Sequence, residues 1–141
     1  MWHIIWPIAL VVLANLFYHI CSKSTPGDAN AFLSLCVTYL IAAVASFALF
    51  VFTGQTKNLI NELSKLNWAS FALGMSIVAL EFGYICAYRS GWKISVGSLV
   101  ANIVLACALV FVGLLLFKEK ISIRQIIGIA VCILGLFLIN K

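Results

Sequence analysis

Charged residues are scarce in this sequence. Only 9% of its 141 residues are Asp, Glu, Lys or Arg, and just four residues are acidic. An ordinary soluble domain is about a quarter charged and about half apolar. Here 65% of the residues are hydrophobic, and the mean hydropathy is +1.17. The composition excludes an ordinary soluble domain and predicts an all-α integral membrane protein, with a single transmembrane domain over residues 1–141.

The sequence motifs of soluble enzymes are also missing. There is no glycine-rich phosphate loop, no serine or cysteine nucleophile beside an evident base, and no metal-ligand spacing. The five cysteines lie in or beside apolar runs without a CxxC pair, which is typical of small apolar residues rather than of disulfides or metal ligands. We therefore expect no enzyme activity, no cofactor and no metal.

Five apolar runs are long enough to cross a bilayer as helices. They comprise residues 4–21, 31–53, 68–89, 94–117 and 123–139. The first run lacks the cleavage site of a signal peptide, so we expect it to remain as a span. Asn30 or Asp28 can cap the second. Residues 54–67 place Leu and Ile at helical spacing with charges between them, which predicts a short amphipathic helix in the membrane interface.

The formal charge of +5 comes from basic residues that stand singly at the ends of these runs. They are typical of topology anchors and lipid headgroup contacts, and no basic patch with interleaved aromatics suggests nucleic acid. With five spans, the two sides of the membrane carry nearly equal positive charge, so the orientation stays open. The N-terminal side has Lys57, Lys65, Lys118, Lys120 and Arg124; the other side has Lys23, Arg89, Lys93 and Lys141.

One acid, Glu81, lies inside the third run. A charge at the bilayer centre costs at least about 3 kcal/mol, so intramembrane acids usually serve a function. Gly74, Tyr84 and Tyr88 share its helical face, which could line a pocket for a cation or a proton. The alternative is a structural ion pair, with Lys23 or Arg89, that fixes helix register.

Other polar residues in the runs are weaker candidates for a binding site. Asn15 and His19 lie four residues apart on one face of the first run, and Asn102 lies in the fourth. Each can supply hydrogen bonds to a substrate, or can simply bond across helices as a packing group. Glu119, between two lysines at a loop, is more simply a solvated charge.

Small residues recur along the fourth and fifth runs. Gly97, Gly113, Gly128 and Gly135 would let helix backbones approach closely, so these residues predict helix packing or dimerisation.

The C-terminal half carries a family resemblance. Its features are Ala87-Tyr88 at a span end, Gly97-Ser98, and the stretch over 117–140, in which Glu119 follows an apolar run before a short loop. This pattern resembles the five-span EamA-like repeat of the drug/metabolite transporter superfamily. It is also similar to the four-span small multidrug resistance family, whose first span carries an essential Glu followed eight residues later by Lys. Here Asn15 and Lys23 hold those two positions.

The resemblance implies a half-size secondary transporter. EamA-like transporters usually contain two inverted repeats, so a single repeat would pair, as an antiparallel homodimer or as a heterodimer with a sister half. It would move a small polar or cationic metabolite across a bacterial or archaeal cytoplasmic membrane. Glu81 would be the acid that binds the substrate or a coupling proton. The alternatives are a subunit of a flippase for lipid-linked substrates, and a structural or regulatory membrane subunit.

Overall fold

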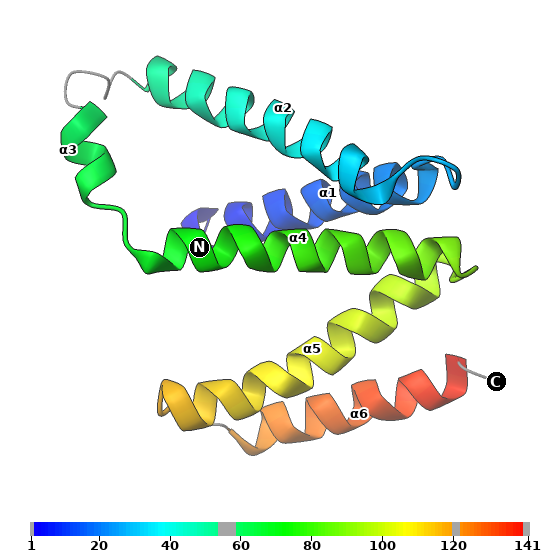
Figure 1. Ribbon diagram of the computed structural model, residues 1–141. Coiled ribbons are helices and arrows are strands. Elements are labelled where there is room, and N and C mark those ends of the chain that lie inside the picture. Colours follow the sequence, from blue (N-terminus) through cyan, green and yellow to red (C-terminus); the bar gives the residue numbers. More distant parts are fainter. Residues whose placement is uncertain (1, 54–58, 120–121, 140–141) are drawn as a thin grey trace. The chain divides into compact units, whose positions relative to one another are not determined.

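The computed structural model describes residues 2–53, 59–119 and 122–139. Within these residues the chain forms six helices and no strand, which confirms the all-α prediction (Figure 1). The chain divides into two compact units, Met1–Ser90 and Gly91–Lys141.

The first unit contains four helices and the second contains two. They are α1 (Trp2–Ser24), α2 (Ala31–Phe52), α3 (Leu59–Ser64) and α4 (Trp68–Arg89), followed by α5 (Ile94–Leu116) and α6 (Ile123–Ile139).

Asparagine side chains begin two of the long helices. The Asn30 side chain accepts a hydrogen bond from the Leu33 amide at 3.1 Å, so Asn30 rather than Asp28 caps α2. The Asn67 side chain accepts one from the Ala69 amide at 3.0 Å at the start of α4. Each cap satisfies an amide that would otherwise have no partner inside the helix.

Four helices are long and apolar enough to cross a membrane: α1, α2, α4 and α5. They correspond to the first four predicted spans. The fifth predicted span is also a helix, α6, but it has only 17 residues. At 1.5 Å per residue it is about 25 Å long, slightly less than the hydrocarbon thickness of about 30 Å. Four of the five predicted spans thus reach full span length.

The predicted interfacial segment, residues 54–67, contains a short helix in its described part. Residues 54–58 lie outside the described part of the chain, and α3 covers only Leu59–Ser64. Lys65 lies about one turn after Glu62, and its ammonium forms an ion pair with the Glu62 carboxylate at 2.5 Å.

Helix α4 is the centre of the first unit and packs against both α1 and α2 (Figure 1). Its contact with α2 is a small apolar cluster near the α1–α2 loop. Ala31 and Leu35 of α2 meet Ile85 of α4 there, and Tyr39 and Phe82 cover the cluster. The core thus holds the first half of α2 against the second half of α4.

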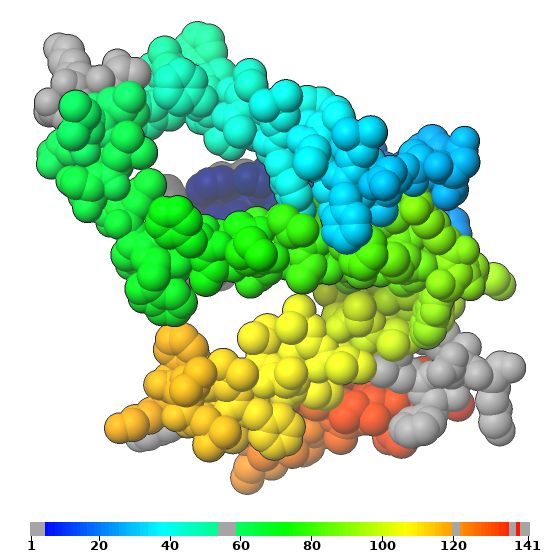
Figure 2. Space-filling model, in the orientation of Figure 1, coloured from blue at the N-terminus to red at the C-terminus, as the bar shows by residue number. Residues whose placement is uncertain are grey.

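The second half of α2 diverges from α4. Leu40, Ile41 and Leu49 point in different directions around this helix, yet each is 64–68% exposed. On α4, Phe71 is 78% exposed, and a Cβ added at Gly74 would meet nothing within 4 Å. We call the space between residues 40–52 and residues 68–78 the α2–α4 cleft. Figure 2 shows it as an opening through which part of α1 is visible.

The second unit is a helical hairpin of α5 and α6 with a tight turn. Lys118 adopts a left-handed conformation (φ 52°), and the Glu119 amide then donates to the Gly113 carbonyl at 3.0 Å. Helix α6 begins with a reciprocal cap: the Gln125 side chain accepts from the Ser122 amide at 2.8 Å, and the Ser122 hydroxyl accepts from the Gln125 amide at 3.3 Å.

Candidate functional site

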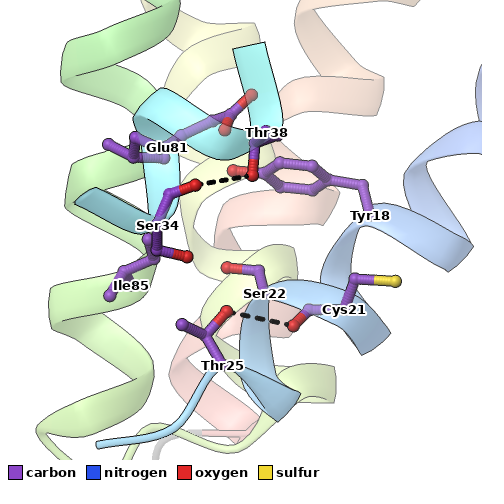
Figure 3. Close-up of a pocket in the computed structure, with 9 residues that line it drawn as sticks. Tyr18, Cys21, Ser22, Thr25, Ser34, Thr38, Glu81 and Ile85 are labelled. Carbon is purple, nitrogen blue, oxygen red and sulfur yellow. Dashed lines mark hydrogen bonds between the residues drawn. The ribbon is translucent and has the colours of Figure 1, made fainter. Parts of the chain in front are cut away.

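Glu81 lines a small pocket inside the first unit. The pocket has a volume of about 120 Å³ and lies among α1, α2 and α4 (Figure 3). Tyr18 extends into it from α1, and Ser34 and Thr38 border it from α2. Its lining consists of Tyr18, Cys21, Ser22, Thr25, Ser34, Leu35, Thr38, Glu81 and Ile85. One acid and five hydroxyl-bearing side chains therefore face a single cavity.

Several hydroxyls around Glu81 have no hydrogen-bond partner. Within the described residues, the buried hydroxyl oxygens of Tyr18, Ser22 and Tyr39 make no hydrogen bond. Tyr39 comes within reach of the Glu81 carboxyl group, but the contact lacks standard hydrogen-bond geometry. Buried polar atoms normally find partners, so unpartnered ones around a cavity indicate a place for water or a polar ligand.

The alternative of an ion pair for Glu81 finds no support in the described part of the chain. There, the ion pair that forms joins Lys65 to Glu62. Lys23 donates to the Tyr88 backbone carbonyl at 3.1 Å, and its ammonium lies 5.6 Å from the Tyr88 ring centre. The acid therefore faces hydroxyls rather than a neighbouring cation.

Arg89 has a structural partner that the sequence did not suggest. Its guanidinium donates to the Pro26 carbonyl at 2.9 Å and to the Ala29 carbonyl at 2.7 Å. Both carbonyls belong to the α1–α2 loop, so Arg89 ties the end of α4 to that loop.

A second polar cluster lies beside the pocket, between α1 and α4. His19 Nδ1 and the Tyr88 hydroxyl are hydrogen-bonded at 2.9 Å, and these side chains are only 8% and 4% exposed. The Tyr84 ring packs edge-on against His19 at 4.8 Å and against Tyr18 at 5.7 Å, measured between ring centres. Through Tyr18, this aromatic cluster adjoins the Glu81 pocket.

The structure brings some of the predicted site residues together and leaves others apart. His19, Tyr84 and Tyr88 form the aromatic cluster, and Glu81 lines the adjoining pocket. Asn15 is exposed on α1, outside the pocket lining. Asn102 is exposed on α5, which belongs to the second unit.

The second unit has a larger and mainly apolar pocket between α5 and α6, of about 400 Å³. It is lined by Ala106, Leu109, Val110, Glu119, Gln125, Gly128, Ile129 and Cys132. Glu119 folds back so closely that a Cβ added at Gly113 would lie 2.6 Å from its carboxylate oxygen. By contrast, a Cβ at Gly128 or Gly135 would meet nothing within 4 Å, and Gly97 is half-buried. Among Gly113, Gly128 and Gly135, the predicted packing glycines at which an added Cβ is described, only Gly113 has a close neighbour.

Sequence reasoning missed the pocket hydroxyls. Tyr18, Ser22 and Thr25 recur at intervals of four and three residues, and Ser34 and Thr38 are four apart. Such spacing places each set on one helical face, so a search for hydroxyl stripes in the apolar runs would have found them.

Comparison with known proteins identifies the family of the chain. The model of the EamA-like transporter family matches residues 2–141. No curated protein and no solved structure matches the chain. Since the family match spans nearly every residue, the chain belongs to the EamA-like transporter family.

Proposed function

We propose that this chain is one half of a dimeric secondary transporter for a small polar or cationic metabolite, with Glu81 as the acid that binds the substrate or a coupling proton. The observation that carries the proposal is the Glu81 pocket. Its carboxylate faces a hydroxyl-lined cavity and has no ion-pair partner among the described residues. An acid that served only to fix helix register would be expected to have such a partner.

The size of the pocket supports pairing with a second half. Ligand sites usually measure about 300–1,000 Å³, whereas this pocket measures about 120 Å³. A second chain packed against the first unit would enlarge the cavity and cover apolar surface. In this proposal α6 is the fifth span, which fits the lower limit of about 17 residues.

The lining of the Glu81 pocket distinguishes among the alternative functions. A lipid phosphate placed in the pocket would be repelled by the Glu81 carboxylate, and no lysine or arginine is among the lining residues to bind it. The flippase alternative therefore comes second. A purely structural subunit would have little use for the buried hydroxyls of Tyr18 and Ser22, which have no partner among the described residues.

The test is transport by the purified full chain in liposomes, loaded with a panel of amines, amino acids and neutral polyols. We expect Glu81→Gln to abolish uptake or exchange of the substrate that wild type moves. Glu62→Gln is the matched control, because Glu62 lies on α3 outside the pocket. If Glu81→Gln transports normally and only its stability falls, the acid is structural and the proposal fails.

Pairing needs a separate measurement. Reporters at each terminus that work on only one side of the membrane would detect both orientations if identical chains pair in antiparallel fashion. A single orientation for all molecules would exclude that arrangement and leave a parallel dimer or a sister half.

A further inference from the structure

The polar groups of the Glu81 pocket are suited to accept hydrogen bonds. The carboxylate of Glu81 is an acceptor, and the Tyr18 and Ser22 hydroxyls, which have no partner among the described residues, offer lone pairs as well as one proton each. The Thr25 hydroxyl donates to the Cys21 carbonyl at 3.3 Å, and the Thr38 hydroxyl donates to the Ser34 carbonyl at 3.0 Å, as Figure 3 shows. Because their protons are used in this way, these two oxygens present lone pairs to the cavity.

Such a lining favours a cation that donates hydrogen bonds. An alkylammonium group carries three N–H donors, one for the carboxylate and two for hydroxyl oxygens. A quaternary ammonium has no N–H and is usually held by several aromatic faces. Tyr18 is the single aromatic residue among the lining residues, and the volume of about 120 Å³ also favours a compact headgroup.

The α2–α4 cleft offers a different environment next to this pocket. At 100° per residue, Gly74 lies within roughly 20° of Glu81 around α4, two turns closer to the start of that helix. The cleft between residues 40–52 and 68–78 therefore opens along the same helical face as the acid. Beside it, Leu49 of α2 and Phe71 of α4 are apolar and are 67% and 78% exposed. An alkyl chain placed there would cover apolar surface.

We propose that the substrate of this site is an amphiphilic primary amine, whose ammonium group binds Glu81 and the pocket hydroxyls while its alkyl portion lies in the α2–α4 cleft. This inference rests on the proposed function, since it assigns the substrate class of the same pocket. It adds two requirements: at least one N–H on the cation, and an apolar tail on the ligand.

The headgroup is tested by calorimetric binding to the full chain in lipid nanodiscs, with empty nanodiscs subtracted. The probes are hexylammonium and hexyltrimethylammonium, which share a tail and differ in N–H donors. We expect hexylammonium to bind at least tenfold more tightly, and Glu81→Gln to weaken it by about tenfold to hundredfold. Glu62→Gln should bind as wild type does. Equal binding of the two probes overturns the headgroup assignment.

The tail is tested with methylammonium, butylammonium and hexylammonium. If the alkyl tail of the ligand enters the cleft, binding affinity should rise by up to about fourfold for each methylene added to the tail. Gly74→Leu should flatten this dependence, because the added side chain occupies the cleft, while methylammonium binding stays unchanged. Gly83→Leu is the matched control: Gly83 also has open space around it, but it lies roughly 200° from Glu81 around α4. The cleft assignment is overturned if affinity still rises with tail length in Gly74→Leu, or if Gly83→Leu loses this rise to the same extent.

The two proposals can fail separately. If the protein transports a hydrophilic solute in a Glu81-dependent way but does not bind alkylammonium ions, the proposed substrate class is wrong and the transporter proposal stands. If it binds alkylammonium ions in a Glu81-dependent way but transports no tested amine, the binding site stands and the transporter proposal is wrong.

Discussion

The Tyr88 hydroxyl lies 2.9 Å from Nδ1 of His19, and both side chains are buried between α1 and α4. This hydrogen bond joins residues 69 positions apart in the sequence. It therefore connects the first and third predicted spans within the aromatic cluster.

Removing the Tyr88 hydroxyl should destabilise the first unit. Tyr88→Phe leaves the His19 ring nitrogen buried without its partner, a loss of about 1–3 kcal/mol. Tyr84→Phe is the control, because the Tyr84 hydroxyl makes no hydrogen bond to a described residue while its ring packs similarly. Chemical unfolding in mixed micelles measures both variants. Equal stability of the two variants would mean that the bond contributes nothing.

The same bond can be isolated by a double-mutant cycle. His19→Leu combined with Tyr88→Phe removes both polar partners, so the pair should lose less stability than the sum of the single variants. Strict additivity would show that His19 and Tyr88 act independently.

Arg89 should hold the α1–α2 loop closed. Its guanidinium donates to the Pro26 and Ala29 carbonyls, and Arg89→Gln removes the reach and most of the donors needed for both. We expect faster amide exchange over residues 25–30, measured by mass spectrometry in nanodiscs. Lys93→Gln, a loss of positive charge four residues later in the sequence at a residue without a side-chain cap bond, should leave exchange there unchanged. Equal acceleration in both variants would attribute the effect to charge alone.

Gly113 should resist substitution more than other helix glycines. Gly→Ala inside a helix normally stabilises by about 0.5–1 kcal/mol, and Gly128→Ala should show this gain because nothing lies within 4 Å of its added Cβ. At Gly113 the new Cβ would meet the Glu119 carboxylate at 2.6 Å. The carboxylate must move, so Gly113→Ala should gain less or lose stability. Combining Gly113→Ala with Glu119→Ala should restore the usual gain in stability. If Gly113→Ala alone already gives the full gain, the close contact with Glu119 is refuted.

Much of this architecture follows from local sequence. The apolar runs and the asparagines at 30 and 67 define where α2 and α4 begin, because cap and span chemistry act within one segment. The length of α6 shows the limit of that approach: its run of apolar residues was recognisable, but 17 residues lie at the edge of what can span a bilayer.

The site was less predictable, for a physical reason. Glu81 was evident as a lone intramembrane acid, but its neighbours Tyr18 and Ser34 come from two other helices. Which hydroxyls converge depends on how α1 and α2 cross α4, and periodicity within one helix does not determine that crossing. Similarly, the left-handed Lys118 and the folded-back Glu119 side chain depend on turn geometry rather than composition.

Tyr18 and Asn15 should differ sharply in their effect on binding, although they lie one turn apart on α1. Tyr18 lines the pocket with a buried hydroxyl that no described residue hydrogen-bonds, so Tyr18→Phe should weaken hexylammonium binding by about threefold to tenfold. Asn15 is exposed and outside the lining, so Asn15→Ala should bind within about twofold of wild type. The calorimetric assay in nanodiscs compares both variants directly. A large loss in Asn15→Ala with none in Tyr18→Phe would move the site to that face of the first span and away from Glu81.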